Sequence, residues 1–210
     1  MNRLLIILLA GWMLLSACAD EDGPFFLTTH SGAAAEMDGT WASCVSLGGS
    51  SMWMSISGQG TGYTINMDSH FGVADCSTSP DLTSDQAGTV HARGPVDAWL
   101  GVEQVPANRI AAVPDSHEVA IHNAGLVATY NTAHNGKGYY GITDWVAGQA
   151  RSVLGYTEEG YVKTYPARNL IYFDDRITPV RLHTGDENAP WDEYGYPTYL
   201  VDLFYLTKSP

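Results

Sequence analysis

The sequence predicts an all-β domain that forms a single antiparallel β-barrel or a barrel-like sandwich. Short segments alternate apolar and polar residues, turn residues separate them at close intervals, and no long amphipathic helix pattern is present. Closure into a barrel would remove the exposed edge strands that such a sheet otherwise has. We therefore expect one domain over residues 38–208.

The clearest period-two alternation lies in residues 51–57 and 63–68, on either side of the turn Gly58-Gln59-Gly60. One face of this predicted hairpin carries six large apolar residues, Met52, Met54, Ile56, Tyr63, Ile65 and Met67. This face is flexible and partly aromatic, so it could line a ligand cavity, and it could equally fill a closed core. These six residues are the candidate ligand-binding set.

Other strands are expected where further apolar stretches are separated by turn signals. They cover residues 87–90, 99–105, 117–121, 126–130, 139–143, 162–165, 170–173 and 199–206. The strands at 117–121 and 126–130 would form a second hairpin around Asn123-Ala124-Gly125. Asp144 could cap a short helix over residues 145–153, although Gly148 lies inside it.

The first residues resemble a bacterial export signal. Arg3 precedes an apolar stretch from Leu4 to Leu15, which is shorter than the about 20 residues that a membrane-spanning helix needs. Leu15-Ser16-Ala17-Cys18 follows and resembles the bacterial lipobox, in which the cysteine is acylated and the chain is cut before it. We expect a signal peptide over residues 1–17 and lipid, including palmitate, on Cys18. The alternative is an ordinary secretory peptide, because Ala17-Cys18-Ala19 also has a small-x-small pattern.

Both alternatives export the chain, and acylation would hold it on a membrane. Two or three acyl chains anchor a protein stably, at about 0.8 kcal/mol for each buried CH₂. Ala19 stands where an aspartate would resemble an inner-membrane retention signal, so we expect the outer membrane, on the side facing the periplasm. Residues 18–37 have no sustained period and are expected to form a flexible tether.

The chain is acidic, with a formal net charge of −13 near pH 7. Cleavage after Ala17 would also remove Arg3 and make the charge one unit more negative. Such a surface repels phosphate, which argues against nucleic-acid binding and against charge-driven docking on anionic lipid. A solvated acidic surface is the simplest explanation of this composition.

The chain has three cysteines, and lipid on Cys18 would leave Cys44 and Cys76. In an oxidising periplasm this pair indicates one disulfide, and the alternative is two buried free thiols. Neither cysteine has a neighbour at metal-binding spacing, so a zinc site is not expected.

Catalytic signatures were sought and not found. His117 and His122 are one residue too far apart for the zinc motif HExxH, and on a strand they would point to opposite faces. The acidic residues between 186 and 193 lack the spacing of an EF-hand calcium site. The side chains of the adjacent Asp174 and Asp175 would point to opposite faces of a strand, so they cannot act as a paired acid and base. No G-x-S-x-G, P-loop or dinucleotide fingerprint is present. We expect no enzymatic activity, no metal and no cofactor.

Several motifs resemble known families. Asp38-Gly39-Thr40-Trp41 is similar to the start of lipocalins and lipocalin-like (calycin) barrels, in which the tryptophan packs across the closed end. The same motif with Cys44 and the later Asp75-Cys76 also resembles a group of small bacterial secreted proteins, and the related extracellular domain of the adenomatosis-polyposis-coli down-regulated type. Residues 195–198 and 205–208 resemble the closing segment of that bacterial group. The resemblance implies a small β-barrel without catalytic residues.

Two functions of different classes are consistent with these patterns. The first is an envelope lipoprotein that binds a small apolar ligand in its barrel, and the resemblance to ligand-carrying barrels favours it. The second is a non-catalytic structural or protein-interaction lipoprotein with a solid barrel, whose partner the sequence does not indicate. Aromatic residues near the C-terminus could pack in the core or form a binding surface: Trp191, Tyr194, Tyr196, Tyr199, Phe204 and Tyr205.

Overall fold

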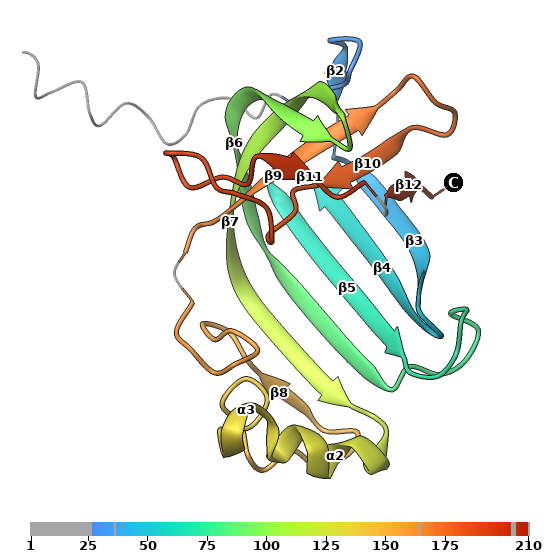
Figure 1. The fold of residues 1–210 in the computed structure, drawn as a ribbon, viewed down its shortest axis with the longest axis vertical. Helices are drawn as coiled ribbons and strands as arrows, with labels where there is room; N and C mark the ends of the chain where they lie inside the picture. Colours follow the sequence, from blue (N-terminus) through green and yellow to red (C-terminus); the bar gives the residue numbers. More distant parts are fainter. Residues whose placement is uncertain (1–26, 36, 164, 203–204, 210) are drawn as a thin grey trace, which may run out of the picture.

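The computed structural model describes residues 27–35, 37–163, 165–202 and 205–209. The expected signal peptide over residues 1–17 and the expected lipidation site Cys18 lie outside this part of the chain. Within it, no helix has the length and apolar character needed to cross a membrane. Most of the described chain forms one large β-sheet that closes on itself (Figure 1).

Eight strands close the barrel, and every neighbouring pair is antiparallel. Their order around the barrel is β3 (Gly39–Leu47), β4 (Ser50–Gln59), β5 (Gly62–His70), β6 (Leu82–Leu100), β7 (Glu103–Ile121), β9 (Ala167–Asp174), β10 (Arg181–Thr184) and β12 (Leu206–Lys208), which pairs with β3 again. The predicted all-β class and the single antiparallel barrel are therefore confirmed. The first predicted hairpin is also confirmed, as β4 and β5.

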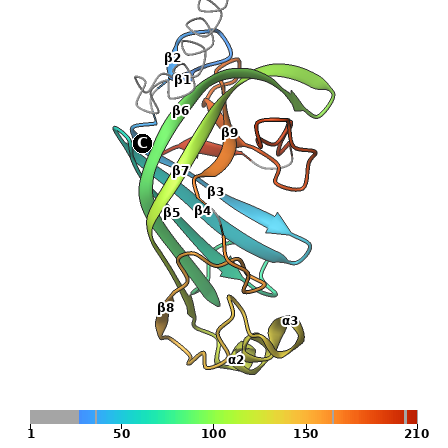
Figure 2. The same cartoon turned by 90° about the vertical axis from the view of Figure 1, so that its left-hand side faces the viewer.

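The barrel wall is tall on one side and short on the other. β6 and β7 have 19 residues each, whereas β10 has four and β12 has three. β12 pairs with β3 only at Trp41 and Ala42, so the rest of β3 continues past it. Figures 1 and 2 show β3 to β7 extending well beyond β9, β10 and β12 toward the two helices. The interior at that end is consequently covered by loops.

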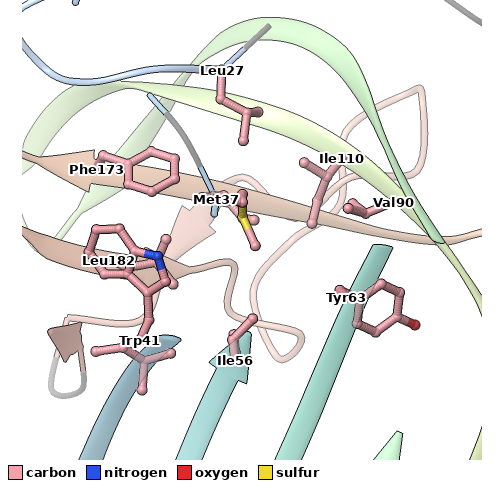
Figure 3. Packing of buried hydrophobic residues seen from close by; sticks show 11 residues of the cluster. Leu27, Met37, Trp41, Ile56, Tyr63, Val90, Ile110, Phe173 and Leu182 are labelled. Atoms are coloured by element: carbon pink, nitrogen blue, oxygen red, sulfur yellow. The ribbon is translucent and has the colours of Figure 1, made fainter. Parts of the chain in front are cut away.

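One end of the barrel is filled by a cluster of buried apolar side chains (Figure 3). All eight strands contribute to this core cluster, through Trp41, Ile56, Tyr63, Val90, Ile110, Ile171, Phe173, Leu182 and Leu206. Trp41 is 3% exposed and packs edge-on against Phe173, with 5.5 Å between the ring centroids. The Nζ of Lys208 lies 5.8 Å from the centroid of Trp41. The tryptophan therefore closes this end of the barrel.

The first described residues form a small hairpin, β1 (Leu27–Thr28) with β2 (Ala34–Ala35). Leu27 and Met37 belong to the core cluster, and the backbone N–H of Thr28 donates to Oδ1 of Asn108 at 3.0 Å. The tether expected over residues 18–37 is therefore too long at its C-terminal end. Residues 27–35 and 37 pack on the barrel because two large apolar side chains cover its closed end. Residues 18–26 lie outside the described part.

The opposite end carries α2 (Ala124–Asn131) and α3 (Ala133–Gly136). The strand predicted at residues 126–130 is wrong, because this segment is α2. The side chain of Asn123 accepts a hydrogen bond from the backbone N–H of Gly125 at 2.9 Å and so caps the helix. Leu126 and Val127 pack against a second apolar cluster that includes Trp145.

The helix predicted over residues 145–153 is also wrong. Gly148 has a φ of +75°, which is not helical, and β8 (Ala150–Ser152) pairs with the end of β7. The single strand expected at residues 99–105 is the tip of a hairpin, in which residues 99–100 end β6, residues 103–105 begin β7, and Gly101 at a φ of +60° lies in the turn between them. Of the remaining expected strands, residues 139–143 contain one isolated bridge, between Tyr139 and Ile142, and in residues 162–165 Val162 forms an isolated bridge with Tyr156. The strand expected at residues 199–206 begins with β11 (Tyr199–Leu200), which runs parallel to β6.

The disulfide between Cys44 and Cys76 is confirmed. It joins β3 to the loop between β5 and β6, with 6.0 Å between the Cα atoms and 32 residues of separation along the chain. Cys44 is exposed and Cys76 is half-buried. The cross-link therefore lies at the periphery of the barrel.

Candidate functional site

A cavity of about 910 Å³ lies inside the barrel, next to the core cluster. β4, β5, β6 and β7 line one side of it, and the loops around Tyr156–Lys163 and Thr184–Asn188 line the other. Several loop residues are exposed, so the cavity opens to solvent between the loops. Cavities of roughly this size hold small molecules in many proteins.

The apolar wall of the cavity comes from the first predicted hairpin. Five of the six candidate ligand residues line it: Met52, Met54, Ile56, Ile65 and Met67. Cross-strand pairing places Met54 beside Met67 and Ile56 beside Ile65, so their side chains form one continuous patch. This patch is called the apolar wall below.

The sixth candidate, Tyr63, is not among the lining residues. It is 6% exposed and belongs to the core cluster, as Figure 3 shows. Its hydroxyl accepts a hydrogen bond from Nε2 of Gln86 at 2.6 Å, and burial raises the pKa of Tyr63. Gln86 itself lines the cavity, so Tyr63 supports the site by orienting the amide.

A polar strip on β6 and β7 adjoins the apolar wall, because Gln86 pairs with Ile65 and Ser84 with Met67 across β5 and β6. Besides Gln86 it contains Ser84 and His117, whose Oγ and Nε2 atoms are 2.9 Å apart. Burial, with a smaller effect of nearby Lys163, lowers the pKa of His117, so the imidazole is neutral near pH 7. The strip therefore offers neutral hydrogen-bonding groups.

A tight turn at residues 157–161 forms one side of the opening. The N–H of Gly160 donates to the carbonyl of Thr157 at 2.8 Å, and the N–H of Tyr140 donates to the carbonyl of Glu158 at 2.9 Å. Gly160 has a φ of +78°, and a Cβ there would lie 2.8 Å from the backbone nitrogen of Gly141. Only glycine therefore lets the turn lie directly on this backbone, which places Glu158 and Glu159 in the lining.

An aromatic cluster lies next to this turn. Tyr139 contacts the rings of Tyr130 and Tyr140, each with 4.7 Å between centroids. Burial raises the pKa of both Tyr139 and Tyr140, and the nearby negative charge of Glu158 adds to this effect. Both tyrosines therefore stay neutral near pH 7.

A second turn, at residues 186–189, lies on the other side of the opening. Oδ1 of Asp186 accepts from the backbone N–H of Asn188 at 2.9 Å, and the Asp186 carbonyl accepts from the N–H of Ala189 at 3.0 Å. Gly185 precedes the turn, and a Cβ there would lie 2.3 Å from Oδ1 of Asn169. This close approach brings Asp186 and Glu187 into the lining.

The other polar residues considered in the sequence are dispersed. His122 contacts Thr83 at 3.1 Å while His117 contacts Ser84, so the two histidines face opposite sides of the sheet. Asp174 pairs with Arg176 at 2.8 Å, and Asp175 bonds Ser31 instead. Across the described residues, no group of three or more His, Cys, Asp or Glu could hold a metal ion.

The C-terminal aromatic residues mostly serve packing or lie at the surface. Tyr196 is buried, whereas Trp191 and Tyr194 are at least half exposed. The guanidinium of Arg109 lies 5.0 Å from the ring of Tyr194 and 5.3 Å from that of Tyr196, and it pairs with Asp192 at 2.7 Å. These contacts hold the loop on β7, outside the cavity. Phe204 lies outside the described residues.

Sequence reasoning missed the loop side of the cavity. Tyr140 and Tyr156–Glu159 come from segments without regular alternation, and the acidic residues near 186 were interpreted as solvated surface. Comparison with protein-family models finds no match, and comparison with curated proteins finds none either. The barrel and its cavity are therefore the features of the protein that bear on its function.

Proposed function

We propose that this protein is a lipid-anchored envelope lipoprotein of the lipocalin-like type, whose barrel binds a small molecule with a large apolar part. The observation that carries the proposal is the cavity of about 910 Å³ with five apolar side chains along one wall. Ligand sites commonly combine such a wall with a few polar groups. The protein would hold or carry its ligand and catalyse no reaction.

Burial distinguishes the apolar wall from the core at every wall residue except Ile56, which belongs to both. Leu182 and Leu206 in the core cluster are fully buried, whereas Met52, Met54, Ile65 and Met67 are only half-buried. A bound hydrocarbon would remove this remaining apolar surface from water, which contributes about 25 cal/mol per Å². Methionine side chains also adapt their shape to different ligands.

The direct test is native mass spectrometry of the mature protein purified from its own envelope, followed by titration with the neutral apolar dye N-phenylnaphthylamine. We expect a co-purified apolar molecule and saturable dye fluorescence. Met54→Trp should fill the cavity and abolish both, while Thr64→Trp, on the exposed face of β5, should retain both. Absence of ligand and of saturable dye binding would overturn the proposal.

The anchor is proposed from Leu15-Ser16-Ala17-Cys18 alone. Mass spectrometry of the membrane-fraction protein should find an acylated Cys18 at the mature N-terminus. A mature chain that begins at Asp20 and carries no lipid would contradict the anchor, while leaving the ligand proposal open to its own test.

A protein-interaction role is the second candidate, and exposed apolar residues at the tip of the β6–β7 hairpin favour it. Val102 is 98% exposed, and Trp99 stacks on Tyr199 with 6.3 Å between the centroids. Single exposed apolar residues are common in monomers, so this observation is weaker than the cavity. Failure of the dye titration would favour this candidate.

A further inference from the structure

The lining of the cavity contains more acidic than basic side chains. It contains four carboxylates, Glu158, Glu159, Asp186 and Glu187, and a single amine, Lys163. Carboxylates are ordinarily charged near pH 7, and the neutral His117 adds no positive charge. These described lining residues therefore carry a net charge of about −3 near pH 7.

The charge and the apolar surface lie on different parts of the cavity. All four carboxylates belong to the two turns at residues 157–161 and 186–189, whereas the apolar wall belongs to β4 and β5. Backbone hydrogen bonds hold both turns at the opening, and Oδ1 of Asp186 accepts a further bond from the N–H of Asn188. The cavity is thus amphipathic, with an acidic opening and a hydrocarbon-like wall.

Aromatic rings accompany the carboxylates. Tyr140 and Tyr156 line the same side of the cavity as Glu158 and Glu159. The face of a tyrosine ring attracts an ammonium group, by about 0.5 to 2 kcal/mol depending on its exposure to water. Carboxylates and aromatic rings together are the groups that proteins use to bind organic cations.

We infer that the molecule bound here is a cationic amphiphile, with an amine head group among the four carboxylates and a hydrocarbon part on the apolar wall. This inference rests on the proposed function, because it names the chemical class of ligand for the same cavity. A fatty acid would instead place its carboxylate beside like charges, which repel it.

Three amphiphiles with the same dodecyl chain provide the test. Dodecylamine, dodecanol and dodecanoate are each used to displace N-phenylnaphthylamine from the mature protein near pH 7. Dodecylamine should bind on the order of tenfold more tightly than dodecanol, and dodecanoate should bind more weakly than dodecanol. Salt should reduce both differences, since the opening is exposed to solvent.

Variants then locate the charge effect. The double substitution Glu158→Gln with Glu187→Gln should lower the preference for dodecylamine over dodecanol several-fold. Glu118→Gln, at an exposed position of β7 that does not line the cavity, should leave this preference unchanged. Equal binding of the three amphiphiles, or tighter binding of dodecanoate, would overturn this inference while the dye still supports the cavity. Failure of the dye itself to bind would overturn the proposed function.

Discussion

Removing the disulfide should destabilise the domain chiefly by freeing the unfolded chain. The substitution Cys44→Ser with Cys76→Ser opens a loop that spans 32 residues. The chain-entropy relation then predicts a loss of roughly 3 to 4 kcal/mol in the free energy of unfolding. Because Cys44 is exposed and Cys76 is half-buried, little packing is lost with the sulfur atoms.

Urea unfolding followed by tryptophan fluorescence measures this loss. The urea dependence of the unfolding free energy should also rise, since the unfolded chain without its cross-link exposes more surface. The matched control is the unchanged chain after reduction, which should have the stability of the double variant. A loss below about 1 kcal/mol in both samples would refute the loop-entropy reasoning.

Three other changes test the core, an ion pair and the turn at the cavity opening. Leu182→Ala removes a fully buried side chain of the core cluster and should cost about 2 to 5 kcal/mol in urea unfolding, whereas Val102→Ala at the exposed hairpin tip should change stability by less than about 0.5 kcal/mol. Hydrogen bonds from Arg176 lower the pKa of Asp174, so that carboxylate stabilises the fold above its unfolded pKa and loses this contribution as the pH falls through its lowered folded pKa. Asp174→Asn should therefore cost about 1 to 3 kcal/mol near pH 7 and much less in strong acid, and a difference independent of pH would contradict the assignment. Gly160→Ala combines a positive φ with a Cβ 2.8 Å from the Gly141 backbone, while Gly49→Ala has a positive φ in open space. Gly49→Ala should lower the free energy of unfolding by about 1 to 2 kcal/mol. Gly160→Ala should lower it by more, and should also weaken dye binding because the turn moves. Equal losses in the two variants would show that the contact with Gly141 is unimportant.

Local patterns in the sequence were sufficient where the interactions are local. The β4–β5 hairpin was predicted because its alternation is regular and its turn is short, so each residue's face follows from its position. The long β6–β7 hairpin was missed because bulges between Ala87 and Gly88 and between Ala92 and Pro95 shift the alternation between faces.

The segment at residues 126–130 illustrates a different limit. A short apolar run of this length fits a strand and one face of a helix equally well. Capping by Asn123 and contacts with the second apolar cluster favour α2, and only the first of these could be seen in the sequence. The tether was expected to extend too far along the chain for a similar reason, because the burial of Leu27 and Met37 depends on the barrel end that they cover.

The sequence by itself determined the all-β class, the disulfide pair and the apolar face that carries the candidate ligand residues. Only the tertiary structure placed Tyr63 in the core and the other five candidates along a cavity, with Ile56 belonging to both the cavity lining and the core cluster. It also brought the acidic turns, more than 80 residues away in the chain from β5, to the same opening. The physical reason is that the face to which a strand residue points follows from its position among its neighbours in the sequence. The formation of the cavity instead depends on how far β9, β10 and β12 extend beside β3 and β7.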